Sequence, residues 1–207
     1  MPARPALREV TADSGIAVMN KTVAVANYFV AKGLAEDVFD SVPPKIMALT
    51  YYAHGWFLGI TGKPMLDREF VAAANGPDIP ELSRLMRQYG NGRVTDLLRV
   101  MTPDPKVPGR SQRAAPIIPP SSPLQVMLAK VWKGLGKVGV YKLSDISCAP
   151  FTPWASVWYQ RGQQAGKSLL IKDEALQQWF AERRVKSGSK MEISLESITL
   201  SRYEGSA

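Results

Sequence analysis

Two side chains of this 207-residue sequence could act together as a nucleophile and a base: Cys148 and His54, its only cysteine and its only histidine. Such a pair works through a thiolate, so the thiol needs a lowered pKa and must lie within hydrogen-bond reach of the imidazole. His54 sits among aromatic residues on an apolar helical pattern, and Cys148 is far away in the sequence. A lone histidine in that setting is typical of a hydrogen-bonded core residue, so we expect a protein that is not an enzyme.

Metal and cofactor sites have little support in the sequence. A structural zinc site needs about four Cys or His ligands, and the chain has one residue of each type. Residues 162–168, GQQAGKS, end as a phosphate-binding loop does, but their glycines are one residue too close and no apolar strand precedes them. We therefore expect no metal and no cofactor.

Aromatic residues are a stronger indication of function, because large rings supply both core and binding surface. Four of them fall within two helical turns and another follows later in the chain: Tyr51, Tyr52, Trp56, Phe57 and Trp154. One helix cannot bury every ring equally. We therefore predict that most are core and that Tyr52, Trp56 and Trp154 border an aromatic groove suited to a peptide segment of a protein partner.

The formal net charge is +8, with a sequence pI of about 9.6. This balance permits acidic protein partners or nucleic acid, but it says nothing about the fold. Four basic residues lie close together near the C-terminus: Arg183, Arg184, Lys186 and Lys190. The simplest interpretation is a solvated face, and the alternative is that this set, with Arg183 and Arg184, contacts an acidic protein surface or phosphates. No motif for sequence-specific DNA recognition accompanies them.

Apolar residues recur at three- and four-residue spacing through most of the chain, which predicts α-helices. We expect helices at about 21–32, 44–60, 80–89, 95–101, 124–135, 140–146, 153–158 and 173–185. Asn20 is the expected cap of the first helix and Gly33 its stop, and Pro43-Pro44 opens the second helix, which we expect to be the central one. A short strand is expected at 69–73. The fold class is therefore mainly α, a single compact helical domain with a few short strands.

The domain organisation follows from breaks in this pattern. We expect an irregular N-terminal arm at 1–20, a helical domain at 21–160 and a C-terminal extension at 161–207 with a helix and a candidate strand. Within the domain, residues 102–121 form a proline-rich flexible insertion, because prolines block helix continuation and sheet pairing. No segment approaches the roughly 20 apolar residues of a membrane helix, and a single cysteine suits a reducing cytoplasm, which is the expected location.

Several segments, taken in order, carry a family resemblance. They are residues 25–29 (VANYF), 51–58 (YYAHGWFL), 61–65 (TGKPM), 75–77 (NGP) with 79–82 (IPEL), 143–144 (LS) and 153–154 (PW). Their order and spacing across residues 21–160 resemble the Panacea domain family. The chain departs from the family pattern where His54 replaces a usual glutamine, Asn75 a usual tyrosine, and Ser147-Cys148 a usual Thr-His.

The resemblance implies a mostly helical domain of the kind found in bacteria, phages and mobile elements. It also implies an antitoxin that neutralises a cognate toxin by direct contact, with presentation of the toxin to a protease as a variant of that role. The motif and core positions that it marks are Tyr51, His54, Gly55, Lys63, Pro64, Gly76, Pro77 and Pro153. Two alternatives stay open: a phage or mobile-element protein that binds a host protein or nucleic acid, and a diverged enzyme using His54 and Cys148.

Overall fold

The computed structural model describes residues 20–104, 106–160, 169–186 and 193. Over these ranges the fold is mainly α, as predicted, with seven α-helices and a few short antiparallel strands. The helices are α1 (Lys21–Ala35), α2 (Pro43–Thr61), α3 (Pro80–Met86), α4 (Leu124–Leu135), α5 (Val140–Ser147), α6 (Pro153–Trp158) and α7 (Asp173–Lys186), with a 3₁₀ turn at Arg87–Tyr89. The strands are β1 (Phe70–Ala73), β2 (Gly76–Asp78), β3 (Val100–Pro103), β4 (Ser111–Ala114) and β5 (Leu170–Ile171).

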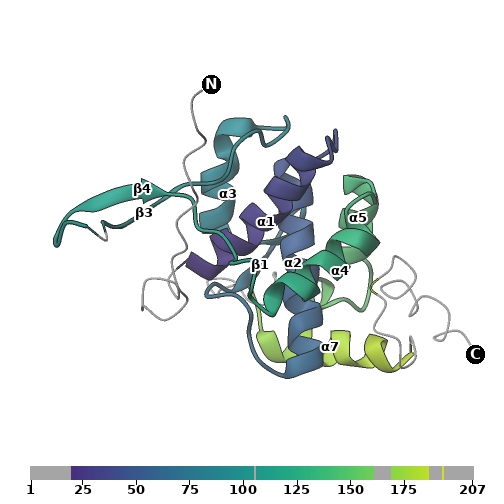
Figure 1. Cartoon of the computed structure of the whole chain (residues 1–207). Coiled ribbons are helices and arrows are strands. Elements are labelled where there is room, and N and C mark those ends of the chain that lie inside the picture. The colour runs from purple at the N-terminus through teal and green to yellow at the C-terminus, as the bar shows by residue number, and fades with distance from the viewer. Residues whose placement is uncertain (1–19, 105, 161–168, 187–192, 194–207) are drawn as a thin grey trace, which may run out of the picture.

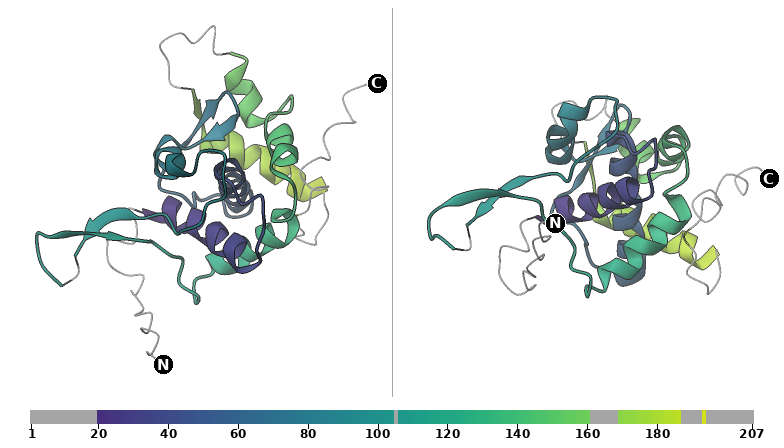
Figure 2. Two further views of the ribbon diagram at one scale, coloured as in Figure 1. Left: turned by 90° about the horizontal axis from the view of Figure 1, so that it is seen from above. Right: turned by 45° about the horizontal axis from the view of Figure 1, so that its top comes forward.

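Helix α2 is the centre of the fold, with α1, α4, α5 and α7 packed around it (Figures 1 and 2). Most of its residues are buried, from Ile46 to Leu58, so its apolar surface extends round most of the helix. It begins at Pro43-Pro44 and ends at Gly62, whose φ of +68° is the left-handed value that suits glycine. The predicted central helix is confirmed.

The closest helix crossing in this core lies between α2 and α7. A Cβ on Gly55 would lie 1.9 Å from Cε2 of Phe180, and one on Gly59 would lie 2.8 Å from the backbone nitrogen of Ala181. Because residues four apart share a helix face, the two glycines form a flat strip onto which α7 packs. Helix α7 therefore belongs to the same core, although we expected it in a C-terminal extension. The residues that follow the predicted boundary at 160/161 lie outside the described part.

The first helix is capped from a distance. Asn20 occupies the N-cap position, but its side chain makes no capping hydrogen bond. Instead, Asp67 Oδ1 accepts hydrogen bonds from the backbone nitrogen and the hydroxyl of Thr22, at 2.9 and 2.7 Å. Gly33 was predicted to stop this helix and lies inside it. A Cβ there would lie 2.2 Å from Ser41 Oγ, so this glycine permits the following loop to fold back closely.

The helix predicted at 95–101 is wrong, because that backbone is bound by a side chain of α1. The Asn27 amide accepts from the backbone nitrogen of Leu98 at 2.7 Å and donates to its carbonyl at 3.0 Å and to that of Pro116 at 2.8 Å. These bonds occupy the groups of Leu98 that a helix would pair internally.

Two small antiparallel sheets complete the described part. The first has the order β2-β1-β5, with Ala73 paired to Gly76 at the β1–β2 turn and Phe70 paired to Ile171, so the predicted strand at 69–73 is confirmed. The second pairs β3 with β4, from Val100 opposite Ala114 to Pro103 opposite Ser111. We expected the prolines of residues 102–121 to block sheet pairing, and this expectation is wrong. Pairing is possible because Pro103 is the last residue of β3 and Pro108 lies in the loop between the strands.

The strand predicted near the C-terminus lies outside the described residues, as does most of the N-terminal arm. None of the helices described is both long enough and apolar enough to cross a bilayer.

Candidate functional site

An open groove of about 570 Å³ lies where α2 begins, beside the β1–β2 turn, the end of α3 and one face of α5. We call it the α2–β2 groove. Its size is in the range of ordinary ligand sites. It is lined by Pro43, Pro44, Met47, Ala48, Tyr51, residues 73–78, Ser83, Met86, Arg87, Gly90, Asn91, Ser144 and Ser147.

The apolar wall of the groove is made of short and flexible side chains. Pro43, Pro44 and Ala48 come from the first turns of α2, and Met47 and Met86 face the groove from two different helices. Methionine adapts its shape readily to a partner because its side chain is unbranched and polarizable. This wall therefore suits an apolar group of variable shape.

Most polar groups that line the groove already have partners. The Ser83 hydroxyl donates to the Asp78 carboxylate, and the Ser144 hydroxyl donates to the Asn75 carbonyl at 3.1 Å. The Ser147 hydroxyl donates to the carbonyl of Ser144 at 2.9 Å. These contacts fix part of the rim, while the exposed side chains of Asn75, Arg87 and Asn91 also line the groove.

Tyr51 differs from the other polar lining residues because its polar atom is buried. Its side chain is buried, and its hydroxyl makes no hydrogen bond to any group in the described part of the chain. Burial raises the pKa of this hydroxyl, so it stays protonated and can donate. A buried hydroxyl without a partner costs about 1–3 kcal/mol. A bound molecule that accepts this hydrogen bond would recover that cost.

The β1–β2 turn positions the floor of the groove. Gly76 has a φ of +125°, which side-chain-bearing residues rarely adopt, and a Cβ there would lie 3.4 Å from Cys148 Sγ. Pro77 has no N–H to donate, so β2, although it is an edge strand, is a poor template for another strand. The two motif residues thus shape a groove floor that does not extend the sheet.

The three residues of the predicted aromatic groove are buried, and none of them lines the α2–β2 groove. Tyr52 is fully buried and donates to the carbonyl of Leu143 at 3.1 Å. Trp56 is 2% exposed and packs edge-on to Phe180 at 5.5 Å. Trp154 donates to the carbonyl of Ala73 at 2.8 Å. Close packing around α2 covers these rings, so the open surface lies one to two turns earlier on the helix.

The predicted basic pair is divided by its surroundings. Arg183 is buried, with its guanidinium carbon 3.2 Å from the centre of the Trp179 ring and Nη1 donating to the Trp179 carbonyl at 3.1 Å. These contacts and its burial make this arginine a packing residue, and burial lowers its pKa to about 10. Arg184, the next residue, is exposed.

His54 and Cys148 each contact other side chains. His54 is 1% exposed, and its Nε2 lies 3.0 Å from Asp173 Oδ1 at the start of α7. Cys148 contacts the Ser147 hydroxyl at 4.0 Å, and burial raises the pKa of its thiol. A thiolate nucleophile needs the opposite shift. No hydrogen bond joins the two side chains within the part of the chain described here.

Comparisons of the chain with protein-family models, with curated proteins and with solved structures find no match. The Panacea resemblance therefore stays a prediction, and the residues of this chain alone carry the functional argument.

The remaining motif residues have structural positions. Lys63 and Pro64 are exposed in the turn after α2, where the Lys63 backbone nitrogen donates to Thr61 Oγ1. Pro153 is the first residue of α6, and the Thr152 hydroxyl before it caps that helix by accepting from Ala155 N. Over the described ranges, no three His, Cys, Asp or Glu residues come together as a metal site would require.

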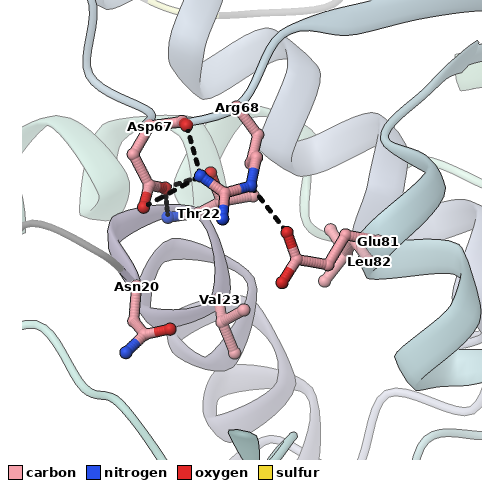
Figure 3. Close-up of a pocket in the computed structure, with 7 residues that line it drawn as sticks. All are labelled: Asn20, Thr22, Val23, Asp67, Arg68, Glu81 and Leu82. Atoms are coloured by element: carbon pink, nitrogen blue, oxygen red, sulfur yellow. Dashed lines mark hydrogen bonds and ion pairs between the residues drawn. The ribbon is translucent and has the colours of Figure 1, made fainter. Parts of the chain in front are cut away.

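A second depression, beside the start of α1, holds an ion-pair cluster (Figure 3). Arg68 donates through Nε to Glu81 at 2.6 Å and through Nη1 to the Asp67 carbonyl at 2.8 Å. The hydrogen bond to Glu81 raises the pKa of Arg68. The depression has no room for a water molecule, so these groups lock α1 to α3 rather than bind a ligand.

Sequence reasoning missed Met47, Ala48 and Met86 as groove residues. Their periodic spacing marks them as core, and periodicity alone cannot tell a packed face from one that borders open space. Ser144 and Gly76 lie in segments that carried the family resemblance, so a signal for them was present.

Proposed function

We propose that this protein is an antitoxin-like binding factor that holds a protein partner inactive by direct contact through the α2–β2 groove. The observation that carries the proposal is that several segments distant in the sequence line the same groove. Residues 43–51, 73–78, 83–91 and 144–147 are separated in sequence and line one open groove with the buried, unpartnered hydroxyl of Tyr51. Such a combination of an adaptable apolar wall and a few polar groups suits an anchoring side chain of a partner.

Exposed aromatic residues close to the groove support a protein as the partner. Tyr141 exposes 85% of its surface and lies one helical turn before Ser144, so both share a face of α5. Phe39 exposes 90% of its surface in the loop before α2, and the neighbouring Asp40 accepts a hydrogen bond from the Val140 backbone nitrogen at 3.2 Å. Aromatic residues are enriched at protein interfaces, where they act as anchors.

The experiment fills the groove and leaves the fold in place. Ala48 is partly exposed on α2 and lines the groove, and Ala129 is exposed on α4 away from it, so Ala48→Trp and Ala129→Trp form a matched pair. Each variant is co-expressed with the product of every neighbouring gene in the source genome. We expect one such product to arrest growth, and the wild type and Ala129→Trp to restore growth and co-purify with it.

Ala48→Trp is expected to lose both the rescue and the co-purification while its thermal denaturation stays close to that of the control. Equal rescue by Ala48→Trp would remove the groove from the proposal. If no neighbouring product is toxic or co-purifies with the wild type, the antitoxin role itself fails.

A further inference from the structure

Strands β3 and β4 form a two-stranded ribbon that leaves the body of the protein (Figures 1 and 2). We call residues 99–114 the ribbon. Four antiparallel residue pairs hold it together, ending at Pro103 opposite Ser111. Because the ribbon projects outward, both its face and its connecting loop are accessible to a large partner.

The register places basic side chains on one exposed face. Residues directly opposite each other in an antiparallel pair share a face, so Met101 and Arg113 lie together, followed by Pro103 and Ser111. All four residues are exposed, and the exposed Arg99 continues this face two residues before Met101. On the opposite face Thr102 is 8% exposed. Its cross-strand partner Gln112 is exposed, so only part of that face is covered, while the face with Met101 and Arg113 is open.

The charge of the ribbon is strongly one-sided. It carries four basic residues against one acidic residue: Arg99, Lys106, Arg110 and Arg113 against Asp104. The single ion pair there joins Arg110 Nε to Asp104 Oδ2 at 3.9 Å, with 70% of the arginine side chain exposed. Asp104 is only 14% exposed and also accepts from the Lys106 backbone nitrogen, whereas the exposed Arg110 guanidinium at 3.9 Å is held only loosely and is accessible to another anion.

The shape and composition of the ribbon select among anionic partners. A two-stranded ribbon has the width that the major groove of B-DNA accepts, whereas the major groove of duplex RNA is too narrow. Residues 99–114 include no aromatic residue on which unstacked bases could stack, which argues against single strands, and protein interfaces are usually rich in aromatics. We propose that the basic side chains of the β3–β4 ribbon, on its open face and in its connecting loop, bind the phosphate backbone of duplex DNA, independently of the α2–β2 groove.

The test compares two variants with the same loss of charge. The ribbon variant carries Lys106→Ala, Arg110→Ala and Arg113→Ala, and the control carries Lys130→Ala, Lys133→Ala and Lys137→Ala in and just after α4. Binding to a fluorescein-labelled duplex of about 20 base pairs is followed by anisotropy from about 50 to 200 mM salt. Circular dichroism confirms that both variants are folded.

We expect the wild type and the control to bind the duplex with an affinity that falls steeply with salt. Since each phosphate contact contributes about 0.9 to the slope of log affinity against log salt, the ribbon variant should show a slope shallower by about 2.7. Absence of wild-type binding at the lowest salt would overturn the proposal. Equal losses in both variants, or equal wild-type affinity for a single strand or for polyglutamate, would also overturn it, because charge alone would then explain the binding.

Discussion

The two halves of α2 are both largely buried, but they differ in their side chains and in what lies beside them. From Tyr52 to Gly59 the helix is covered, with Trp56 against Phe180 and the glycine strip against α7. From Pro43 to Tyr51 it borders the α2–β2 groove, where the lining side chains are proline, alanine and methionine. The comparison teaches that dense aromatic residues mark the half of the helix packed on α7, while smaller or more flexible side chains mark the half beside the groove.

The largest expected effect comes from closing the glycine strip. Gly55→Val places side-chain atoms inside the Phe180 ring and should lower the free energy of unfolding by about 3 kcal/mol, because α7 must move away from α2. Urea denaturation measures the loss. The control is Ala48→Val on the groove side of the same helix, for which we expect a change of about 0.5 kcal/mol. Equal losses in the two variants would contradict the division of the helix into a packed and an open half.

A smaller effect is expected at His54, which joins the packed half to the first residue of α7. His54→Ala removes the hydrogen bond to Asp173 and should cost about 2 kcal/mol of stability without changing affinity for a partner at the groove. His54→Gln keeps a donor and should lose less. Denaturation of the two variants, with co-purification of the partner, separates the roles. If both variants were stable and both failed to co-purify with the partner, His54 would have a direct role in binding.

Tyr51 lies at the junction between the two halves, so it sharpens the comparison. Tyr51→Phe removes a buried hydroxyl that has no partner in the described part of the chain, so the free protein should keep its stability or gain up to about 1 kcal/mol. Affinity for the groove partner should fall by about fivefold, the loss of one hydrogen bond of about 1 kcal/mol. Thermal denaturation and titration calorimetry report the two effects. A destabilised variant with unchanged affinity would show that the hydroxyl serves the fold.

The smallest effect is expected at Cys148, which lies beside the groove floor. Because burial raises the pKa of its thiol, less thiolate is present near neutral pH than in a free cysteine. Reaction with a chromogenic disulfide reagent should therefore be slow at pH 8 and accelerate as the pH rises. Cys148→Ala should leave rescue and stability within about 0.5 kcal/mol of the wild type. Fast labelling at neutral pH, together with lost rescue, would revive the enzyme hypothesis.

Local signals in the sequence predicted the helices well. The Pro43-Pro44 start and the Gly62 end of α2 are fixed by backbone geometry within a few residues, so the sequence was sufficient for them. The helix expected at 95–101 failed because a competing partner, the Asn27 amide, lies 71 residues away from Leu98 in the chain. Likewise, Asn20 looked like a cap, while the group that binds the first turn of α1 is Asp67.

The candidate site was less accessible to such reasoning. The sequence alone determined a mainly helical protein with a central aromatic helix, a net positive charge and no recognisable metal or phosphate motif. Only the tertiary structure decided that Trp56 and Arg183 are covered, that Met47 and Met86 border a groove, and that Arg99 and Arg113 share a ribbon face. The reason is physical. Periodicity indicates which residues are apolar on one face of a helix, whereas their exposure depends on which distant segment of the chain packs against that face.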